Sequence, residues 1–439
     1  MIFLLGGCLL YLVSIYDKLY QQLLKMPTGV IDLVAYGTFD THLTANPQIT
    51  FFRTVYRRHT NFAIESIEQT FTQYPQFGKK TSLTLTKNGD LVNNMYALVT
   101  LPANISTTYY IYGVGNALFK KIDVTIGGFV IDTHYSDWLN IWGELTTEEG
   151  KLIGYDKMVS NYYQQTQANS STCYVPFRFW FNRNPGLALP LVALAYQDVQ
   201  FLFEFETMEN LSNNTLTSSA NTLNCRIYAD YIFLDTEERR LFGQNMHEYL
   251  IDQVQYNEFQ VASGSSFYNA KLNFNLPVKE LIWVHTPTTT TDYGNFDYSC
   301  NGTSTPDMHT FTSGKLVVNG SDRMPERFAD YYYLVQNYQR HTRVPRTSIV
   351  HNTYDDSLTL KTNAPYRNYI YTYSFALEPE NHQPSGNCNF SKLKNAELQL
   401  KYNAIAYFDY TYSRKLKVFA VNYNVLKIGS GMAGLAYSN

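Results

Sequence analysis

Charged residues are scarce in this sequence of 439 residues: Asp, Glu, Lys and Arg make up 16%, against roughly 25% in an average domain. The net charge is −3, and the basic excess that usually marks a nucleic-acid-binding protein is missing. We therefore expect no specific binding of nucleic acid.

Cysteine is also rare, and the five cysteines include no Cys-x-x-Cys pair. This spacing argues against a disulfide framework or a zinc site. We expect reduced and mostly buried thiols, as in a cytosol-like compartment. The five residues are Cys8, Cys173, Cys225, Cys300 and Cys388.

Sequence signatures of catalysis are missing as well. No Walker loop, His-Glu-x-x-His helix or Gly-x-Ser-x-Gly elbow occurs, so we name no catalytic, metal or cofactor-binding residue and expect no cofactor. Gly429 to Gly434 spell a dinucleotide-binding pattern, but the chain ends at Asn439, before the required helix and acidic residue. We interpret these glycines as flexible positions in a terminal arm, and His341 as an ordinary surface histidine.

Aromatic residues dominate what is present, with 38 Tyr and 27 Phe. They favour strands, and the Asn, Gly and Ser residues between them favour turns. Lys80 to Thr86 alternate polar and apolar residues, Asn88-Gly89-Asp90 is a turn signal, and Met95 to Leu101 follow; this pattern predicts a hairpin. Gly127-Gly128 predicts a second hairpin, between Ile122–Ile126 and Phe129–Ile131.

The second half of the chain repeats this order weakly. Lys315 to Val318 lead into Asn319-Gly320, as the earlier strand leads into its two glycines. Short helices are predicted at 136–145 and at 236–242, the latter capped by Asp235. Many short strands at regular spacing predict a sandwich or barrel. We predict an all-β chain of two consecutive eight-stranded antiparallel jelly rolls, residues 27–236 and 237–439, with a few short helices in loops.

Residues 1–26 differ from the remainder. Ile2 to Ile15 carry no charge and are mostly apolar, but this run is shorter than the roughly 20 residues that span a bilayer. Helical spacing of apolar residues follows it. The segment is either a helix that faces a membrane or a partner, or an annotation extension of a chain that starts at Met26.

Long polar insertions rich in Thr, Ser, Asn and Gly interrupt the predicted strands. Such loops lie on surfaces and carry contacts. Four Asn-x-Ser/Thr sequons fall within them and are candidate glycosylation sites. They are Asn169, Asn210, Asn213 and Asn301.

One long, contiguous and irregular segment carries a family resemblance. It runs from Val34-Ala35-Tyr36-Gly37 through Asn46–Phe52 to Val55–Ser66. It closely resembles the start of the major capsid proteins of nucleocytoplasmic large DNA viruses, those of algal viruses above all. Further matching segments are spread along the chain and include Asn184–Leu191 and Ser430–Tyr437.

The resemblance implies a structural protein and not an enzyme. Members of the family form homotrimers of two jelly rolls each, and these pseudo-hexagonal capsomers tile an icosahedral shell around an internal lipid membrane. The expected location is the virion, after assembly in the host cytoplasm. The expected partners are neighbouring capsomers, minor capsid proteins, the membrane and glycans. Two alternatives stay open: a low-copy minor or vertex capsid protein, and a carbohydrate-binding jelly roll.

Overall fold

The computed structural model describes residues 28–102, 110–161, 171–212, 223–288, 296–299, 309–347, 368–402 and 413–437. The chain separates into two compact units, residues 1–59 and 60–439. In the first unit, the described part holds the short helices α2 (Thr28–Val34) and α3 (Thr41–Thr44). No helix of the described ranges is long and apolar enough to cross a membrane. Both alternatives for residues 1–26 lie outside these ranges.

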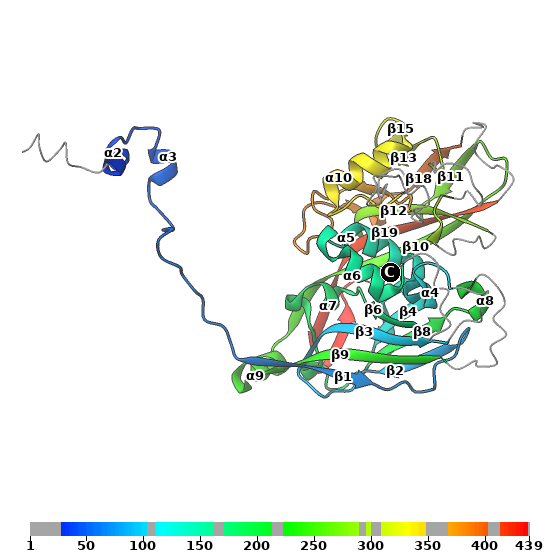
Figure 1. The fold of residues 1–439 in the computed structure, drawn as a ribbon, viewed down its shortest axis with the longest axis horizontal. Coiled ribbons are helices and arrows are strands. Elements are labelled where there is room, and N and C mark those ends of the chain that lie inside the picture. Colours follow the sequence, from blue (N-terminus) through cyan, green and yellow to red (C-terminus); the bar gives the residue numbers. More distant parts are fainter. Residues whose placement is uncertain are drawn as a thin grey trace, which may run out of the picture. The chain divides into compact units, whose positions relative to one another are not determined.

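The second unit begins with two antiparallel sheets that are built from the first half of the chain (Figure 1). One sheet has the order β1-β9-β3-β6, with the short β7 beside β3, and the other has the order β2-β8-β4-β5. The strands are β1 Phe62–Gln69, β2 Lys80–Thr84, β3 Leu91–Leu101, β4 Phe119–Ile126, β5 Phe129–Tyr135, β6 Ser171–Pro176, β7 Leu189–Pro190, β8 Val199–Phe205 and β9 Asn224–Leu234.

Two further antiparallel sheets come from the second half. Their orders are β10-β19-β12-β16 and β11-β18-β13-β14. The strands on these paths are β10 His247–Val261, β11 Phe267–Lys271, β12 Pro277–Pro287, β13 Ser313–Val318, β14 Ser321–Asp322, β16 Tyr371–Ser374, β18 Ala396–Lys401 and β19 Arg414–Gly429. The short strands at their sides are β15 Arg327–Phe328, β17 Cys388–Asn389 and β20 Met432–Leu435.

The two halves share one topology. When β10 replaces β1, β19 replaces β9, β12 replaces β3 and β16 replaces β6, the order of the second half's larger sheet is that of the first. The smaller sheets correspond in the same way. The predicted all-β fold of two antiparallel jelly rolls is confirmed. The short strands β7, β15, β17 and β20 add to the four-strand paths.

In the described part of the second unit, the helices lie in the connections between strands. The two predicted helices are confirmed: α5 and α9, and the Asp235 side chain accepts a hydrogen bond from the backbone N–H of Thr236. Five other helices and one π-helical segment, η4, complete the set used below. The bounds are α4 Val114–Leu118, α5 Ser136–Thr146, α6 Glu149–Val159, α7 Trp180–Arg183, α8 Met208–Leu211, α9 Thr236–Gln244, η4 Tyr331–Val335 and α10 Gln336–Arg340.

One of the two predicted hairpins is present in the structure, and the other is not. Gly127 and Gly128 have φ of 58° and 86° and join β4 to β5 in an antiparallel pair, as expected. The hairpin predicted around Asn88-Gly89-Asp90 is wrong, because β2 pairs with β8 and β3 with β9, in separate sheets. Gly89 is required there for space, since a Cβ atom would lie 2.9 Å from the Tyr231 side chain.

The carboxyl-terminal glycines are not a flexible arm, so that interpretation was wrong. Ser430 and Gly431 have φ of 52° and 81° and form the turn between β19 and β20. Two successive positive φ values are the geometry of a tight two-residue hairpin. The segment therefore completes a sheet, and the dinucleotide-like spelling reflects turn chemistry.

One continuous apolar core runs through both halves of the second unit. Phe201, Phe203 and Phe205 alternate along β8 and are buried, as expected for a strand with one face on a core. Cys173 and Cys225 are buried, and Cys388 is half-buried. Cys8 and Cys300 lie outside the described residues.

Candidate functional site: the joint between the two halves

Helix α5 lies between the two halves (Figure 1). Every residue from Asp137 to Leu145 is buried. Trp138 stacks on Trp142 of the same helix at 5.2 Å and contacts Phe419 of β19 at 5.7 Å between ring centroids. The helix thus packs against the sheet of the other half, and aromatic pairs of this kind stabilise a contact beyond the area they bury.

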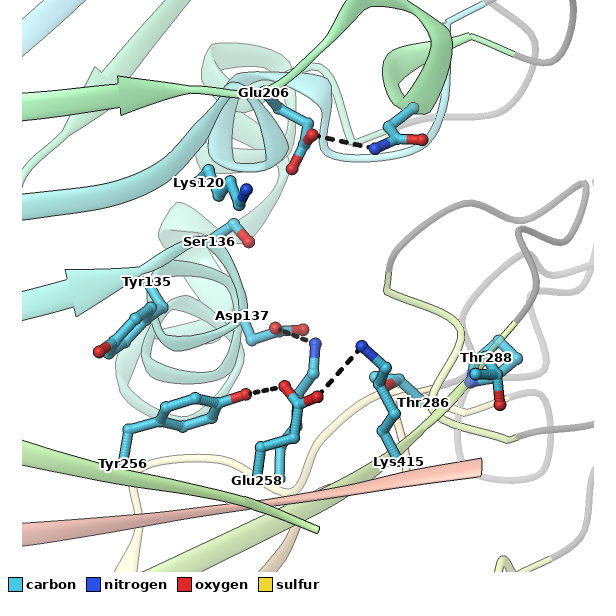
Figure 2. A pocket seen from close by; sticks show the side chains of 13 residues that line it. Lys120, Tyr135, Ser136, Asp137, Glu206, Tyr256, Glu258, Thr286, Thr288 and Lys415 are labelled. Carbon is cyan, nitrogen blue, oxygen red and sulfur yellow. Dashed lines mark hydrogen bonds and ion pairs between the residues drawn. The ribbon is translucent and has the colours of Figure 1, made fainter. Parts of the chain in front are cut away.

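A cavity of about 440 Å³ opens beside α5, lined by side chains of both halves (Figure 2). Asp137 accepts a hydrogen bond from the Lys417 ammonium at 2.6 Å, which joins α5 to β19. Lys415 lies 3.1 Å from a carboxylate oxygen of Glu258, and the Tyr256 hydroxyl donates to the same carboxylate. The polar side chains named here are therefore bonded to one another across the cavity wall.

Each charged side chain that lines this cavity has an ion-pair or hydrogen-bond partner. Besides the pairs above, Lys120 contacts Glu204 at 3.1 Å, and Glu206 accepts from the Asn210 amide at 3.0 Å. In the described part of the chain, no three His, Cys, Asp or Glu side chains gather as metal ligands do. These contacts link the first half of the chain to the second half.

A buried ion cluster forms the deepest part of the joint. Arg343 and Arg346 of the second half reach Glu144 of α5 at 2.9 and 2.5 Å. Arg346 also contacts Asp156 of α6 at 2.5 Å. A guanidinium that bridges two carboxylates in this way restricts both distance and orientation, because its donors form a rigid planar fork.

The protonation states follow from this geometry. Burial by itself would raise the pKa of Glu144, but Arg346 and Arg343 more than offset burial and hold that pKa below its usual value. Burial would likewise lower the pKa of Arg346, and the carboxylates of Glu144 and Asp156 raise it instead. Glu144 and Arg346 are thus charged at neutral pH, and each of these buried charges depends on its partners.

A second polar connection lies along β10. The backbone N–H of Val254 donates to Asp132 of β5 at 3.0 Å, and Gln253 donates to the Ile131 carbonyl. Next to them, Asp252 pairs with Lys279 of β12 at 2.8 Å and with Arg183 of α7 at 3.4 Å. Both ends of the joint are therefore tied by buried hydrogen bonds, and the two halves are held in one relative orientation.

His341 is not a surface histidine, and that interpretation was wrong. Its imidazole is fully buried between Glu280 of β12, at 3.1 Å, and Glu380, at 2.9 Å. Burial alone would lower the pKa of His341, but Glu280 and Glu380 raise it to about 9. The sequence around His341 did not predict its burial or its raised pKa, because Glu280 and Glu380 lie 61 and 39 residues away in sequence.

The candidate glycosylation sites are only partly described. Asn210 is exposed on α8 at the edge of the cavity, and its amide donates to Glu206. Ser212, the hydroxyl residue of the same sequon, is 8% exposed. Asn169, Asn213 and Asn301 lie outside the described residues.

Many large apolar side chains in the described part of the first unit are exposed. Phe51 and Phe52 are 89% and 98% exposed, and Phe39 is 86% exposed. Exposed apolar surface of this extent marks an interaction segment. The other large apolar residues exposed there are Ile31, Leu33, Val34, Tyr36, Leu43, Ile49, Val55 and Tyr56.

The topology and the rigid joint define a class: a structural double jelly-roll protein of the kind that builds viral capsids. Residues 50–235 match the family described as "Major capsid protein N-terminus". Residues 238–360 and 352–434 match the family described as "Large eukaryotic DNA virus major capsid protein". The chain belongs to this major capsid protein family of large eukaryotic DNA viruses.

Relatives agree with this assignment over nearly the whole chain. The chain is 45% identical to the major capsid protein of Pyramimonas orientalis virus, over 94% of this chain and all of that protein. It is 36% identical to that of Paramecium bursaria Chlorella virus 1, with the same coverage.

Solved structures agree as well. A quasi-atomic structure of the PBCV-1 virus capsid has a TM-score of 0.76 and 32% identity, and covers 89% of this chain and all of that one. The Faustovirus major capsid protein, at 12% identity over 90% of this chain and 94% of its own, has a TM-score of 0.67 and supports the fold alone. The chain is a capsid protein, and its relatives are structural proteins of virions.

Proposed function

We propose that three copies of this chain form a homotrimer, and that this trimer is the pseudo-hexagonal capsomer of an icosahedral shell. The observation that carries the proposal is the joint between the halves. Two jelly rolls of one topology are held in one orientation by the buried cluster of Glu144, Asp156, Arg343 and Arg346. A lattice block needs this rigidity, because movement between its two parts would change its outline.

The mass in solution tests the trimer. Size-exclusion chromatography with light scattering is expected to give a mass near three times the 50.6 kDa of the chain. Dilution over two orders of magnitude should leave that mass unchanged, because obligate interfaces are large and apolar. A monodisperse monomer at high concentration would contradict the proposal.

Further parts of the proposal concern domains and surroundings. We propose a domain boundary between residues 236 and 237, and both residues belong to α9, which connects β9 to β10. The shell is assembled in the host cytoplasm. Trimers contact neighbouring capsomers, minor capsid proteins and an internal membrane, and the exposed first unit supplies an apolar segment for such contacts. Asn210 is the described candidate for a glycan, and peptide mass spectrometry of virion protein tests its occupancy.

A further inference from the structure

The carboxyl-terminal strands, drawn in red in Figure 1, reach the first half of the chain. β19 pairs with β10 along one edge from Arg414 to Ile428, and with β12 along its other edge only as far as Asn422. β20 pairs with the end of β19, from Leu426 to Gly429. Because β10 already occupies one edge of that stretch, β20 takes the edge that β12 leaves free, beyond the end of β12.

A loop of the first half is bonded to this hairpin. The backbone N–H of Tyr196 donates to the carbonyl of Gly431 at 3.0 Å. The backbone N–H of Ala433 in β20 donates to the side-chain oxygen of Gln197 at 2.7 Å. Tyr196 and Gln197 directly precede β8 of the first half. A sheet edge of the second half is thus covered by a loop of the first, which is one way in which proteins protect such edges.

Two glycine turns, one from each half, lie against the same two side chains. A Cβ atom at Gly431 would lie 2.4 Å from the ring of Tyr196, and a Cβ atom at Gly127 would lie 2.4 Å from the amide of Gln197. The φ angles of these glycines are 81° and 58°, which glycine adopts without a steric penalty. Both turns therefore require glycine, because Tyr196 and Gln197 leave no room for a side chain.

This contact lies far from the ion cluster. The Gly127 turn precedes β5, and α5, which carries Glu144, begins where β5 ends. β5 has seven residues, and a strand of this length spans roughly 20 Å. One contact region alone would allow the two halves to rotate about it, whereas two regions at this separation oppose rotation. The hairpin therefore supplies the second of two separated attachments between the halves.

The order of synthesis adds a constraint. Residues 430–437 follow every strand on the four sheet paths, so they are translated after both jelly rolls. Tyr196 and Gly431 are 235 residues apart in sequence. The contact between them therefore forms only after the second jelly roll has been made.

We propose that residues 430–437 are a strap that docks on Tyr196 and Gln197 after both jelly rolls are made and thereby fixes their relative orientation. A chain that stops before residue 430 keeps the strands of both rolls but not this attachment, so incomplete chains do not enter the shell. The first statement concerns the single chain. The exclusion of incomplete chains rests on the trimer proposed above.

Truncation tests the strap in the single chain. One variant ends at Gly429, and the matched control ends at Tyr437, whose carbonyl accepts from the Asn424 amide at 3.0 Å. Hydrogen exchange measured by mass spectrometry should become about tenfold faster or more in residues 192–198 of the first variant, because the N–H of Tyr196 loses its acceptor. The control should exchange as the full chain does. Equal protection of residues 192–198 in both variants would overturn the strap.

A point variant tests the same contact without shortening the chain. Gln197→Ala removes the acceptor of the Ala433 N–H, and Gln200→Ala, at an exposed glutamine of β8, is the matched control. Gln197→Ala should speed exchange in residues 430–437 of the second half, and Gln200→Ala should not. Unchanged exchange there in Gln197→Ala would contradict the strap. This comparison decides the matter if the truncated chain also loses the protection of α5 and so proves to be unfolded.

Co-expression tests the exclusion of incomplete chains. The full chain and the chain that ends at Gly429 are made together, and native mass spectrometry distinguishes them by mass. Every trimer is expected to contain full chains alone, because the truncated chain lacks a fixed orientation of its two rolls. Mixed trimers would overturn the exclusion. A monomeric full chain would instead overturn the proposed trimer, and the exchange measurements would still decide whether the strap exists.

Discussion

The two halves of the chain have the same strand order but different coverings. Helix α5 of the first half is buried from Asp137 to Leu145, whereas the corresponding segment of the second half leaves Leu334, Val335 and Tyr338 exposed. A duplicated topology therefore does not distribute contacts equally. The helix of the first half is covered inside the chain, and the corresponding segment of the second half leaves these apolar side chains exposed.

The buried histidines show the same inequality in their electrostatics. His134 of the first half is fully buried against Phe179, and burial holds its pKa below the usual value despite Asp132. His341 of the second half faces two carboxylates, which raise its pKa to about 9. The fold thus favours the neutral form of His134 and the charged form of His341.

The largest expected effect comes from the ion cluster between the halves. Arg346→Met leaves Glu144 and Asp156 buried with one basic partner fewer, and breaking a buried pair by removing one member costs about 3–5 kcal/mol. The measurement is the free energy of unfolding in urea, at fixed protein concentration because association contributes.

The matched control is Lys427→Met, which removes an exposed pair with Glu248 at 2.8 Å. Exposed pairs contribute little because solvent screens them, so this variant should unfold at nearly the wild-type urea concentration. Equal losses in the two variants would show that the cluster does not hold the halves together.

The next effect is a dependence of stability on pH. The folded-state pKa of His341, about 9, exceeds the usual histidine value of 6.5, so the folded chain binds the extra proton between these values. The stabilisation is complete below pH 6.5, falls as pH rises and is lost above about pH 9; it amounts to about 3 kcal/mol. His341→Gln should flatten this slope when unfolding is measured at pH 6, 7.5 and 9.

His134 provides the opposite slope. Its folded-state pKa is lowered, so its contribution is present above the unfolded value and decreases as pH falls below it. His134→Gln should therefore change the slope on the acidic side and leave the range from pH 6.5 to 9 as in the wild type. Identical pH profiles for the two variants would refute the assigned protonation states.

The smallest effect compares the corresponding turns of the two halves. Gly127→Ala places a Cβ atom 2.4 Å from the Gln197 side chain at a φ of 58°, whereas Gly320→Ala meets no atom within 4 Å at a φ of 80°. Both variants carry the left-handed penalty of about 1–2 kcal/mol. Gly127→Ala should lower the melting temperature more, and a larger loss for Gly320→Ala would contradict the close approach.

Local patterns predicted much of this fold. Paired glycines at 127 and 128 and the Asp235 cap describe short-range geometry, which neighbouring residues determine. The turn at Asn88-Gly89 failed because a turn signal does not say whether the chain stays in one sheet or crosses to another. Gly89 is required by the Tyr231 ring, which is 142 residues distant in sequence.

The contacts between the two halves could not be predicted from the sequence, for the same reason. No sequence pattern marks Glu144, Arg343 and Arg346, because only the folded sandwiches bring them together. Resemblance to a family supplied the class of protein, but not the residues that connect its halves. Those came from distances and burial alone.

The distance along the chain between Glu144 and Arg346, 202 residues, has a consequence for biosynthesis. At about 5–20 residues per second, a ribosome needs about 10–40 seconds to make the arginine after it has made the glutamate. During that interval Glu144 of the first sandwich has no Arg346 guanidinium to neutralise its carboxylate. We therefore expect the final consolidation of the first sandwich to follow translation of the second.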